Sequence, residues 1–342
     1  MSYRLSDRPV ASTDNAPTVS VVIINWNGKA HLARCLAALA AQTYRDFEVI
    51  VVDNGSTDGS VAFVREQYPA VRLICNDRNL GFARANNQGI AIARGRYIAI
   101  LNNDTQAEPQ WLAALVSAAE RHPKMGAFAP LVLFNDRRDV IDSAGLTVSV
   151  LGHGIQNLLG ERVERVKCPC EVFGVSATAA LFRRELLQDI GLFDEDYFIY
   201  YEDVDLAWRA RLRGWRALLV PEAVVYHAHS ATVGRGSPFK KRLLTRNRLW
   251  TIAKDYHFPA IVFFLPLIVA FELGFVVLSL IQGDVAALTG LWQGVTGLPG
   301  ALRKRTAIQS SRTASFRELA PLMHWFNAPF STWRLRRDLG RL

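Results

Sequence analysis

The sequence predicts an α/β fold in which helices cover both faces of a doubly wound, mostly parallel sheet. Short apolar runs rich in β-branched residues alternate with segments of helical spacing, as in consecutive βαβ units. Polar residues directly follow two of these runs, and sheets of this kind bind ligands outside the carboxyl ends of their strands. Half of the 342 residues are hydrophobic, which is enough for a substantial core.

The N-terminal part of the chain carries the clearest alternation. Continuous apolar runs predict buried strands over residues 18–25, 47–52, 71–75 and 97–101. Helical spacing predicts helices between them over residues 28–41, 60–67 and 82–93. Pro109 is expected to open a further helix, because proline fits the first helical turn.

The following part of the chain is less regular. Residues 131–170 scatter Gly, Asp and Arg among short apolar runs, which favours irregular loops with a hairpin. Regular structure is expected to return at residues 172–182. Helices are then predicted over residues 184–190 and 202–213, and strand-like runs over residues 215–220 and 223–226.

A 24-residue apolar stretch, residues 258–281, contains Glu272 as its only ionisable side chain. Much of the net charge of +9 lies behind it, because residues 301–342 contain nine Arg or Lys and two acids. A basic cluster beside such a stretch is typical of the cytoplasmic leaflet of a membrane.

Two prolines and a glycine, Pro259, Pro266 and Gly274, interrupt the apolar stretch. We therefore expect helices that lie in the interface at the cytoplasmic face of the inner or plasma membrane, as in a peripheral or monotopic protein. The basic run at residues 303–305 would contact anionic head groups. A true span, or a helix buried in a homo-oligomer, is the alternative.

Other classes of protein fit the sequence less well. Four cysteines in a chain of this length do not suggest a disulfide framework, and residues 1–15 lack the apolar core of a secretory signal, so we expect a cytoplasmic location. The dinucleotide, P-loop, serine-hydrolase and zinc-protease motifs are absent. Nucleic-acid binding is an alternative, because the basic tail contains the aromatic residues Trp325, Phe326 and Trp333. We expect no nucleic-acid partner.

Two polar clusters end predicted strands. Asp53, followed by Asn54 and Gly55, can accept hydrogen bonds from a ribose or a nucleobase while the glycine lets backbone approach the ligand. Asp104, the last residue of the run Asn102-Asn103-Asp104, can bind Mg²⁺ or Mn²⁺ bridged to a diphosphate. Each cluster taken alone also fits an ordinary Asx-type turn.

A third cluster opens a predicted helix. Glu202 and Asp203 offer a carboxylate that can take a proton from an acceptor hydroxyl, although helix capping is a competing interpretation. By the helical period, one acid can face a cleft while its neighbour anchors the helix through Arg209. His227 and His229 can complete a metal site that has a single acid, or can be hydrogen-bonded structural residues.

The order of these clusters resembles the family 2 glycosyltransferases with the GT-A fold, a Rossmann-like and mostly parallel sheet, and within them the bacterial rhamnosyltransferase-like branch. The resemblance rests on VSVVIINWNG at 19–28, VDNGSTDGS at 52–60 and NLGFARANN at 79–87. Asn102-Asn103-Asp104 is similar to the metal-binding DXD motif, and EDVDLAWR at 202–209 is similar to the acceptor-side ED motif. The segment from residue 246 onward resembles the membrane-associated ending of this branch.

The resemblance implies an inverting, metal-dependent glycosyltransferase, a hexosyltransferase of EC class 2.4. Asp104 would hold the divalent metal, Mg²⁺ or Mn²⁺, with His227 as a further ligand. Asp203 would be the general base, and Glu202 would orient the acceptor or support the base. The residues that would bind the nucleotide-sugar are Asn25, Asn27, Asp53, Asn54, Gly55, Asn79, Gly81, Phe82, Asn86 and Asn103.

Two departures from the family pattern refine this expectation. Asn102 stands where the first acid of the DXD motif would be, so Asp104 is the only carboxylate for the metal. The Q-x-x-R-W motif of processive synthases is missing, which favours the addition of one or a few sugars.

The resemblance also implies a function. A hexose or deoxyhexose, with rhamnose favoured, would move from a dTDP- or UDP-sugar to a hydroxyl of a polyprenyl-linked glycan acceptor, in cell-envelope polysaccharide synthesis. The expected domains are a polar lead at 1–17, a GT-A domain at 18–245, a membrane-associated helical region at 246–310 and a basic tail at 311–342. The alternative is a catalytically silent scaffold that binds nucleotide-sugars at the membrane. The joint presence of Asp53, Asp104 and Asp203 argues against it.

Overall fold

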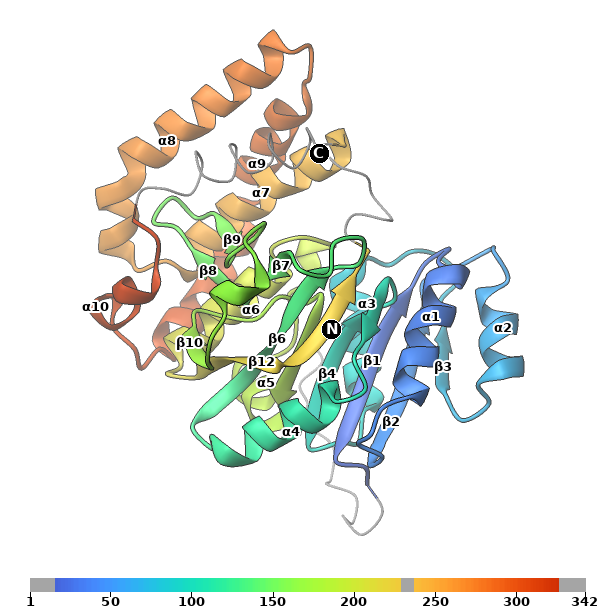
Figure 1. Cartoon of the computed structure of the whole chain (residues 1–342). Helices are drawn as coiled ribbons and strands as arrows, with labels where there is room; N and C mark the ends of the chain where they lie inside the picture. The colour runs from blue at the N-terminus through green and yellow to red at the C-terminus, as the bar shows by residue number, and fades with distance from the viewer. Residues whose placement is uncertain (1–15, 229–236, 326–342) are drawn as a thin grey trace.

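A computed structural model describes residues 16–228 and 237–325 of the chain (Figure 1). The strands are β1 Val19–Asn25, β2 Phe47–Asp53, β3 Arg72–Cys75, β4 Tyr97–Asn102, β5 Thr105–Ala107, β6 Met125–Phe134, β7 Ile141–Ser143, β8 Leu146–Val148, β9 Gly154–Gln156, β10 Cys170–Val172, β11 Ala179–Arg183 and β12 Arg216–His227. The helices are α1 Lys29–Ala40, α2 Ser60–Gln67, α3 Phe82–Ile92, α4 Trp111–Arg121, α5 Arg184–Ile190, α6 Glu202–Leu212, α7 Pro238–Asp255, α8 Phe258–Ile281, α9 Ala286–Ser310 and α10 Phe316–Leu319.

The main sheet has the strand order β10-β12-β6-β11-β4-β1-β2-β3. The pairings β1–β2, β1–β4, β2–β3 and β6–β12 are parallel, while β11 runs antiparallel between β4 and β6. The prediction of an α/β fold with a mostly parallel sheet is therefore confirmed. Because β1, β2 and β4 are parallel neighbours, their carboxyl ends meet at one edge of the sheet.

Helices cover both faces of this sheet. Val19, Val21 and Ile23 of β1 pack in one core, together with α1 and α4. Val22 of β1 points into the other core, which contains residues of α3, α5 and α6. This alternation along one strand is the two-residue period of a pleated sheet that is buried on both sides.

The prediction of irregular loops from residue 131 onward is wrong for residues 131–134, which belong to β6. All ten residues of β6 are buried, so the strand shows no alternation of polar and apolar side chains. Gly126 and Pro130 within it also resemble loop residues. The expected hairpin is present as the antiparallel pair β8–β9.

The two strand-like runs predicted at 215–220 and 223–226 form one strand, β12. Its register against β6 shifts between Val220 and Val224. Pro221 lies in this irregular stretch, where its missing N–H does not interrupt the ladder. The strand continues to His227 and brings that histidine to the sheet edge where β4 ends.

The last three long helices lie together beside the sheet, and α8 projects away from it (Figure 1). Helices α7 and α9 pack closely, since a Cβ added at Gly290 would lie 2.5 Å from the Arg242 carbonyl oxygen. In the described part of the chain, α8 is the one helix long and apolar enough to cross a membrane. Most of its surface is exposed, with Phe263 and Ile281 exposed by 75% and 77%.

Candidate functional site

The carboxyl ends of β1, β2 and β4 are joined by side-chain hydrogen bonds. Asn25 donates through Nδ2 to Asp53 Oδ2 at 2.9 Å and accepts through Oδ1 from Asn103 Nδ2 at 2.8 Å. Asp53 Oδ1 accepts from the Ser56 amide at 2.8 Å. Asn25 and Asp53 are almost completely buried, so the network fixes the geometry of this edge.

The loops after β1 and β2 are held together in the same way. The Asn27 amide donates to Ser56 Oγ at 2.8 Å, and Asn27 Oδ1 accepts from the Thr57 amide at 2.8 Å. Gly55 has a φ of +80°, and a Cβ there would lie 2.7 Å from Arg78 Cα. Glycine is required here both for the left-handed backbone and for the close approach.

A second set of amides shapes the loop before α3. Asn54 Nδ2 donates to Asn79 Oδ1 at 3.0 Å, which in turn accepts from the Gly81 amide at 2.9 Å. Asn86 on α3 is buried, and within the described residues its Oδ1 has no hydrogen-bond partner. The backbone amide of Phe82 donates to the Phe198 carbonyl at 2.6 Å, which joins this loop to the turn before α6.

Asp104 and His227 lie next to each other at the same edge. Asp104 Oδ1 is 3.4 Å from His227 Nε2, and His227 Nδ1 is 2.6 Å from Asp142 Oδ2. Burial alone would raise the pKa of Asp104, but His227 outweighs it and the pKa is lowered. Burial opposes the charge of His227, yet the carboxylates of Asp104 and Asp142 raise its pKa to about 9.

These residues fit a divalent cation that is shared with a diphosphate. Asp104 Oδ1 is buried and makes no hydrogen bond to any residue in the described ranges. A carboxylate, an imidazole and a second carboxylate on the far ring nitrogen form a common arrangement around metals. Across residues 16–228 and 237–325, no three His, Cys, Asp or Glu side chains gather as a metal site, so other ligands would come from substrate and water.

Asp203 lies in the first turn of α6 and faces the segment before β11. Its Oδ2 accepts from the Ala177 amide at 3.3 Å, and its Oδ1 accepts from the Val204 amide at 2.8 Å. The neighbouring Thr178 carbonyl accepts from the Asn102 amide at 2.9 Å, at the end of β4. The segment around Ala177 and Thr178 therefore connects Asp203 to the strand end that precedes Asp104.

Burial raises the pKa of Asp203, against the two backbone amides that lower it. Burial and the adjacent Asp203 charge raise the pKa of Glu202 well above its ordinary value. Glu202 is 5% exposed, and its Oε2 has no hydrogen-bond partner in the part of the chain that the structure describes. A raised pKa makes each of these two neighbouring carboxyls a better proton acceptor than an ordinary Asp or Glu side chain.

The backbone before α6 is strained. Phe198, Tyr200 and Tyr201 have φ values of 65°, 70° and 72°, which is rare for non-glycine residues. Asn247 of α7 holds this turn, because its Nδ2 donates to the carbonyls of Tyr197, Ile199 and Tyr200 at 3.0, 3.0 and 2.7 Å. We call residues 197–203 the acceptor turn.

The expected anchor through Arg209 has a different partner. Arg209 pairs with Asp205 at 2.8 Å and not with Glu202. Asp205 is fully buried and also pairs with Lys254 of α7, which binds Asp194 at 2.6 Å. Asp205 lies one helical turn from Arg209 and balances the buried charges of Arg209 and Lys254. Glu202 and Asp203 therefore do not carry this structural role.

The structure brings the predicted site residues of the described ranges to the carboxyl ends of β1, β2 and β4 and to the adjoining acceptor turn. His229 lies outside the described residues. Three supporting residues were not predicted from the sequence. Asp142 binds His227, Ala177 binds Asp203, and Asn247 binds the acceptor turn. Asp142 lies in a segment with no recognisable pattern, and Ala177 lies between β10 and β11, within the stretch 172–182 for which regular structure was predicted. The Asn247 role depends on a contact across 50 residues.

A family model described as Glycosyl transferase family 2 matches residues 20–191. The N-acetylglucosaminyl-diphospho-decaprenol L-rhamnosyltransferase of Mycobacterium tuberculosis is 35% identical over 240 residues, which cover 63% of this chain and 77% of the relative. This relative matches the branch that the sequence motifs suggested.

Solved structures share the fold. The mannosyltransferase PcManGT from Pyrobaculum calidifontis, in complex with GDP-Man and Mn²⁺, is 20% identical with a TM-score of 0.51, over 93% of this chain and 83% of that one. S. aureus TarS 1-349 in complex with UDP-GlcNAc is 20% identical with a TM-score of 0.54, over 86% of this chain and 91% of that one.

Proposed function

The chain belongs to glycosyl transferase family 2 and is a nucleotide-sugar glycosyltransferase, and from that premise we propose a specific reaction. It moves a hexose or deoxyhexose, rhamnose in the first instance, from a nucleoside diphosphate to a hydroxyl of a glycan acceptor. The transfer is a single displacement that inverts the anomeric carbon. The product belongs to cell-envelope polysaccharide synthesis.

The observation that carries this proposal is the connection of Asp203 to the end of β4. Asp203 accepts from the Ala177 amide, and Thr178 binds the Asn102 backbone. A base held beside the strand that leads to Asp104 can take the acceptor proton while the acceptor oxygen bonds to the anomeric carbon and the bond to the diphosphate breaks. Glu202 supports the base, because its own raised pKa favours a neutral carboxyl beside a charged Asp203.

The donor lies over the joined ends of β1, β2 and β4 in this proposal. Asp53 contacts the nucleoside, and Asn25 and Asn103 orient the strand ends that support it. Gly55 and Gly81 allow the loops under the donor to pack closely against Arg78 and Phe198. The relative from M. tuberculosis, by its name, transfers L-rhamnose, which supports dTDP-rhamnose over UDP-sugars as the donor.

A divalent cation, Mg²⁺ or Mn²⁺, would be held by Asp104 with His227 as the further ligand. It would supply positive charge to the departing nucleoside diphosphate. The buried Asp104 Oδ1 without a hydrogen-bond partner among the described residues supports this assignment. The Asp142 carboxylate on His227 Nδ1 keeps the ring oriented toward Asp104.

We assign the acceptor to a polyprenyl-linked glycan at the cytoplasmic face of the membrane. The relative's name specifies a decaprenol-linked acceptor, and α8 exposes a long apolar surface. The domain plan is 18–245 for the GT-A domain and 246–310 for the membrane-associated region, with residues 1–17 and 311–342 outside both. Lys304 and Arg305 bind Asp196 and the Tyr256 carbonyl within the protein, so they do not serve as the lipid contacts expected for them.

The test is donor binding by thermal shift, with dTDP-, UDP- and GDP-sugars in the presence and absence of Mn²⁺. We expect a shift with one nucleotide class that grows with Mn²⁺, and we expect Asp104→Asn to lose only the Mn²⁺-dependent part. Transfer to a polyprenyl-diphosphate-linked glycan then identifies the acceptor. A folded sample that responds to no donor would favour the silent scaffold instead.

A further inference from the structure

Adjacent residues of α7 contact two parts of the molecule that are far apart in sequence. Asn247 is fully buried and binds three carbonyls of the acceptor turn, as described above. Arg248, the next residue, is 3% exposed and pairs with Glu272 of α8. A displacement of this part of α7 therefore reaches the acceptor turn and α8 together.

The Arg248 guanidinium also binds the hairpin β8–β9. Its Nη1 donates to the Leu151 carbonyl at 3.0 Å and lies 2.8 Å from His153 Nε2. The His153 ring packs against Phe271 of α8 with centroids 4.6 Å apart. Arg248 is thus bonded on one side to α8 and on the other side to the hairpin tip.

The hairpin in turn packs directly on the start of α6. The Gly154 amide donates to the Tyr201 hydroxyl at 3.4 Å. A Cβ added at Gly154 would lie 2.5 Å from Val204 Cγ2, so no side chain fits between them. Val204 is the residue after Asp203, whose Oδ1 binds the Val204 amide. A continuous set of contacts therefore runs from Glu272 to Asp203.

We infer that the Arg248–Glu272 ion pair is a positioning element for sugar transfer, which makes the geometry of Asp203 depend on how α8 is seated. Arg248 is a positioning residue that acts through the hairpin and the acceptor turn. This inference rests on the proposed function, because it assigns Asp203 to the acceptor side of the reaction. It also gives a reason for the single acid in the apolar helix.

Stability alone does not explain this pair. Replacing a buried ion pair with apolar residues of similar volume is often neutral or stabilising, because two charges no longer have to be desolvated. Glu272 is 4% exposed, and within the ranges that the structure describes its Oε2 accepts no hydrogen bond. The pair fixes the rotation of α8 about its own axis and its position along α7. An apolar contact without a specific polar partner would fix neither.

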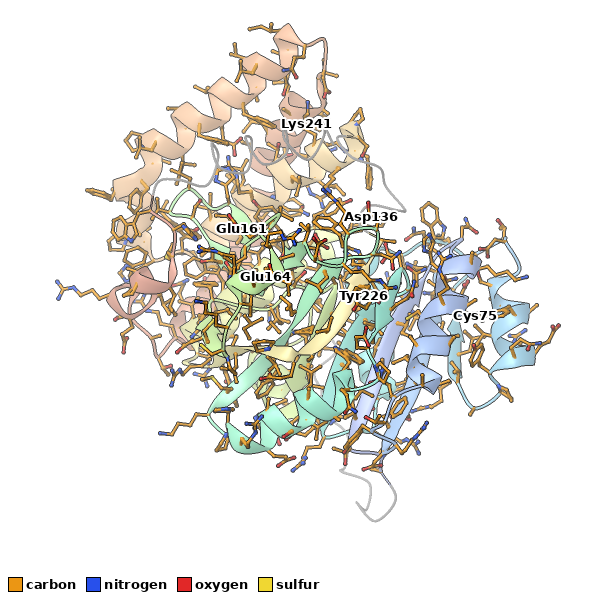
Figure 2. All side chains as sticks on the ribbon, in the orientation of Figure 1. Cys75, Asp136, Glu161, Glu164, Tyr226 and Lys241 are labelled. Atoms are coloured by element: carbon orange, nitrogen blue, oxygen red, sulfur yellow. The ribbon has the colours of Figure 1, made fainter. Side chains whose placement is uncertain are left out.

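The matched experiment compares two double variants of the full chain in lipid vesicles. Arg248→Met with Glu272→Leu removes the positioning pair but keeps an apolar contact. The control is Lys241→Met with Asp284→Asn. It removes a second ion pair, at 2.5 Å, which joins α7 to the connection between α8 and α9. Figure 2 shows Lys241 on α7 beside this helical hairpin, away from the sheet.

Two measurements are made on each variant. For the Arg248–Glu272 variant we expect kcat for transfer to the lipid-linked acceptor to fall about 10- to 100-fold, as for a misplaced catalytic group, with the donor KM unchanged. We also expect hydrogen exchange of the amides at residues 198–206 to accelerate. The control variant is expected to change neither quantity.

The exchange measurement does not depend on the identity of the substrate. If wild-type protein transfers no sugar, the proposed function fails, while faster exchange at residues 198–206 in the positioning variant alone still supports the coupling. Unchanged exchange and unchanged kcat in a folded positioning variant would overturn the inference. If that variant does not fold, Arg248→Lys replaces it, because an ammonium can reach Glu272 but cannot also bridge Leu151 and His153. An Arg248→Lys protein with wild-type kcat and exchange would equally overturn the inference.

Discussion

The proposed donor half and the proposed acceptor half of this site are built by different means. The donor half consists of the ends of β1, β2 and β4, joined by short hydrogen bonds between Asn25, Asp53 and Asn103. The acceptor half consists of the acceptor turn and α6, held by side chains of α7 and by the segment around Ala177. Neighbouring parallel strands bring the first set together, whereas long-range packing brings the second set together.

Because of this difference, we expect the donor half to be rigid and the acceptor half to be adjustable. The donor half belongs to the central sheet, where backbone ladders on both sides fix the strand ends. The acceptor half contains three strained residues whose conformation depends on α7, and α7 packs on α9 and pairs with α8 through Arg248 and Glu272. Damage to the donor half should appear in donor affinity, and damage to the acceptor half should appear in the rate of transfer.

The largest effect is expected from Asp203→Asn. Without a carboxylate to take the acceptor proton, kcat should fall by about 10²- to 10⁴-fold. The donor-dependent thermal shift should remain at its wild-type value, because the donor half is untouched. In the wild type, kcat should decrease on acidification with a midpoint above the ordinary Asp pKa, since burial raises the pKa of Asp203. Loss of donor binding in the variant would break the separation of the two halves.

The next effect is on stability, from Asn247→Ala. The carbonyls of Ile199 and Tyr200 would lose their side-chain donor, while the Tyr197 carbonyl would keep Arg246 Nη2, which should lower the free energy of unfolding by about 1–3 kcal/mol. The melting temperature and the transfer rate should both fall, with the donor KM kept. Thr289→Ala provides the control, because its hydroxyl binds only a carbonyl within its own helix.

Asp53→Asn should act on the donor half alone. Asp53 accepts from both the Ser56 amide and Asn25 Nδ2, and an amide can accept only through its one oxygen. We expect the donor KM to rise about tenfold, which corresponds to about 1.4 kcal/mol. The rate at saturating donor should stay within a factor of about two, and steady-state kinetics at varied donor concentration would reveal a contrary fall in kcat.

The smallest effect is expected from Glu202→Gln. Since the folded pKa of Glu202 is raised, its contribution is fully present below the unfolded pKa and is lost as pH rises through the folded pKa. Glutamine does not ionise, so the variant should gain about 1 kcal/mol over wild type as the pH rises from 5 to 8. Melting curves across this range measure the difference, and a constant offset would show that folding does not raise the pKa of Glu202 above its unfolded value.

The same contrast explains what the sequence could predict. The strands β1, β2 and β4 and their polar ends follow from local apolar runs, so Asp53 and Asn103 were placed at the correct edge. The strand β6 was missed because Gly126 and Pro130 interrupt its apolar run and resemble loop residues. The pairing of Asp205 with Arg209 and Lys254 was missed because Lys254 becomes a neighbour only through packing of α7.

The packing of α9 has a practical consequence for making the protein in quantity. Apolar tails are commonly cut from an enzyme to obtain a soluble shortened chain. Here a cut after residue 257 would remove Lys304, Arg305 and Gln309, which bind Asp194, the Tyr256 carbonyl and the Asp255 carbonyl. The shortened chain would leave Asp194 with Lys254 as its remaining cation and would remove the Lys304 ammonium from Asp196. Polar substitutions at Phe263 and Ile281, on the exposed side of α8, are the better route to a soluble sample.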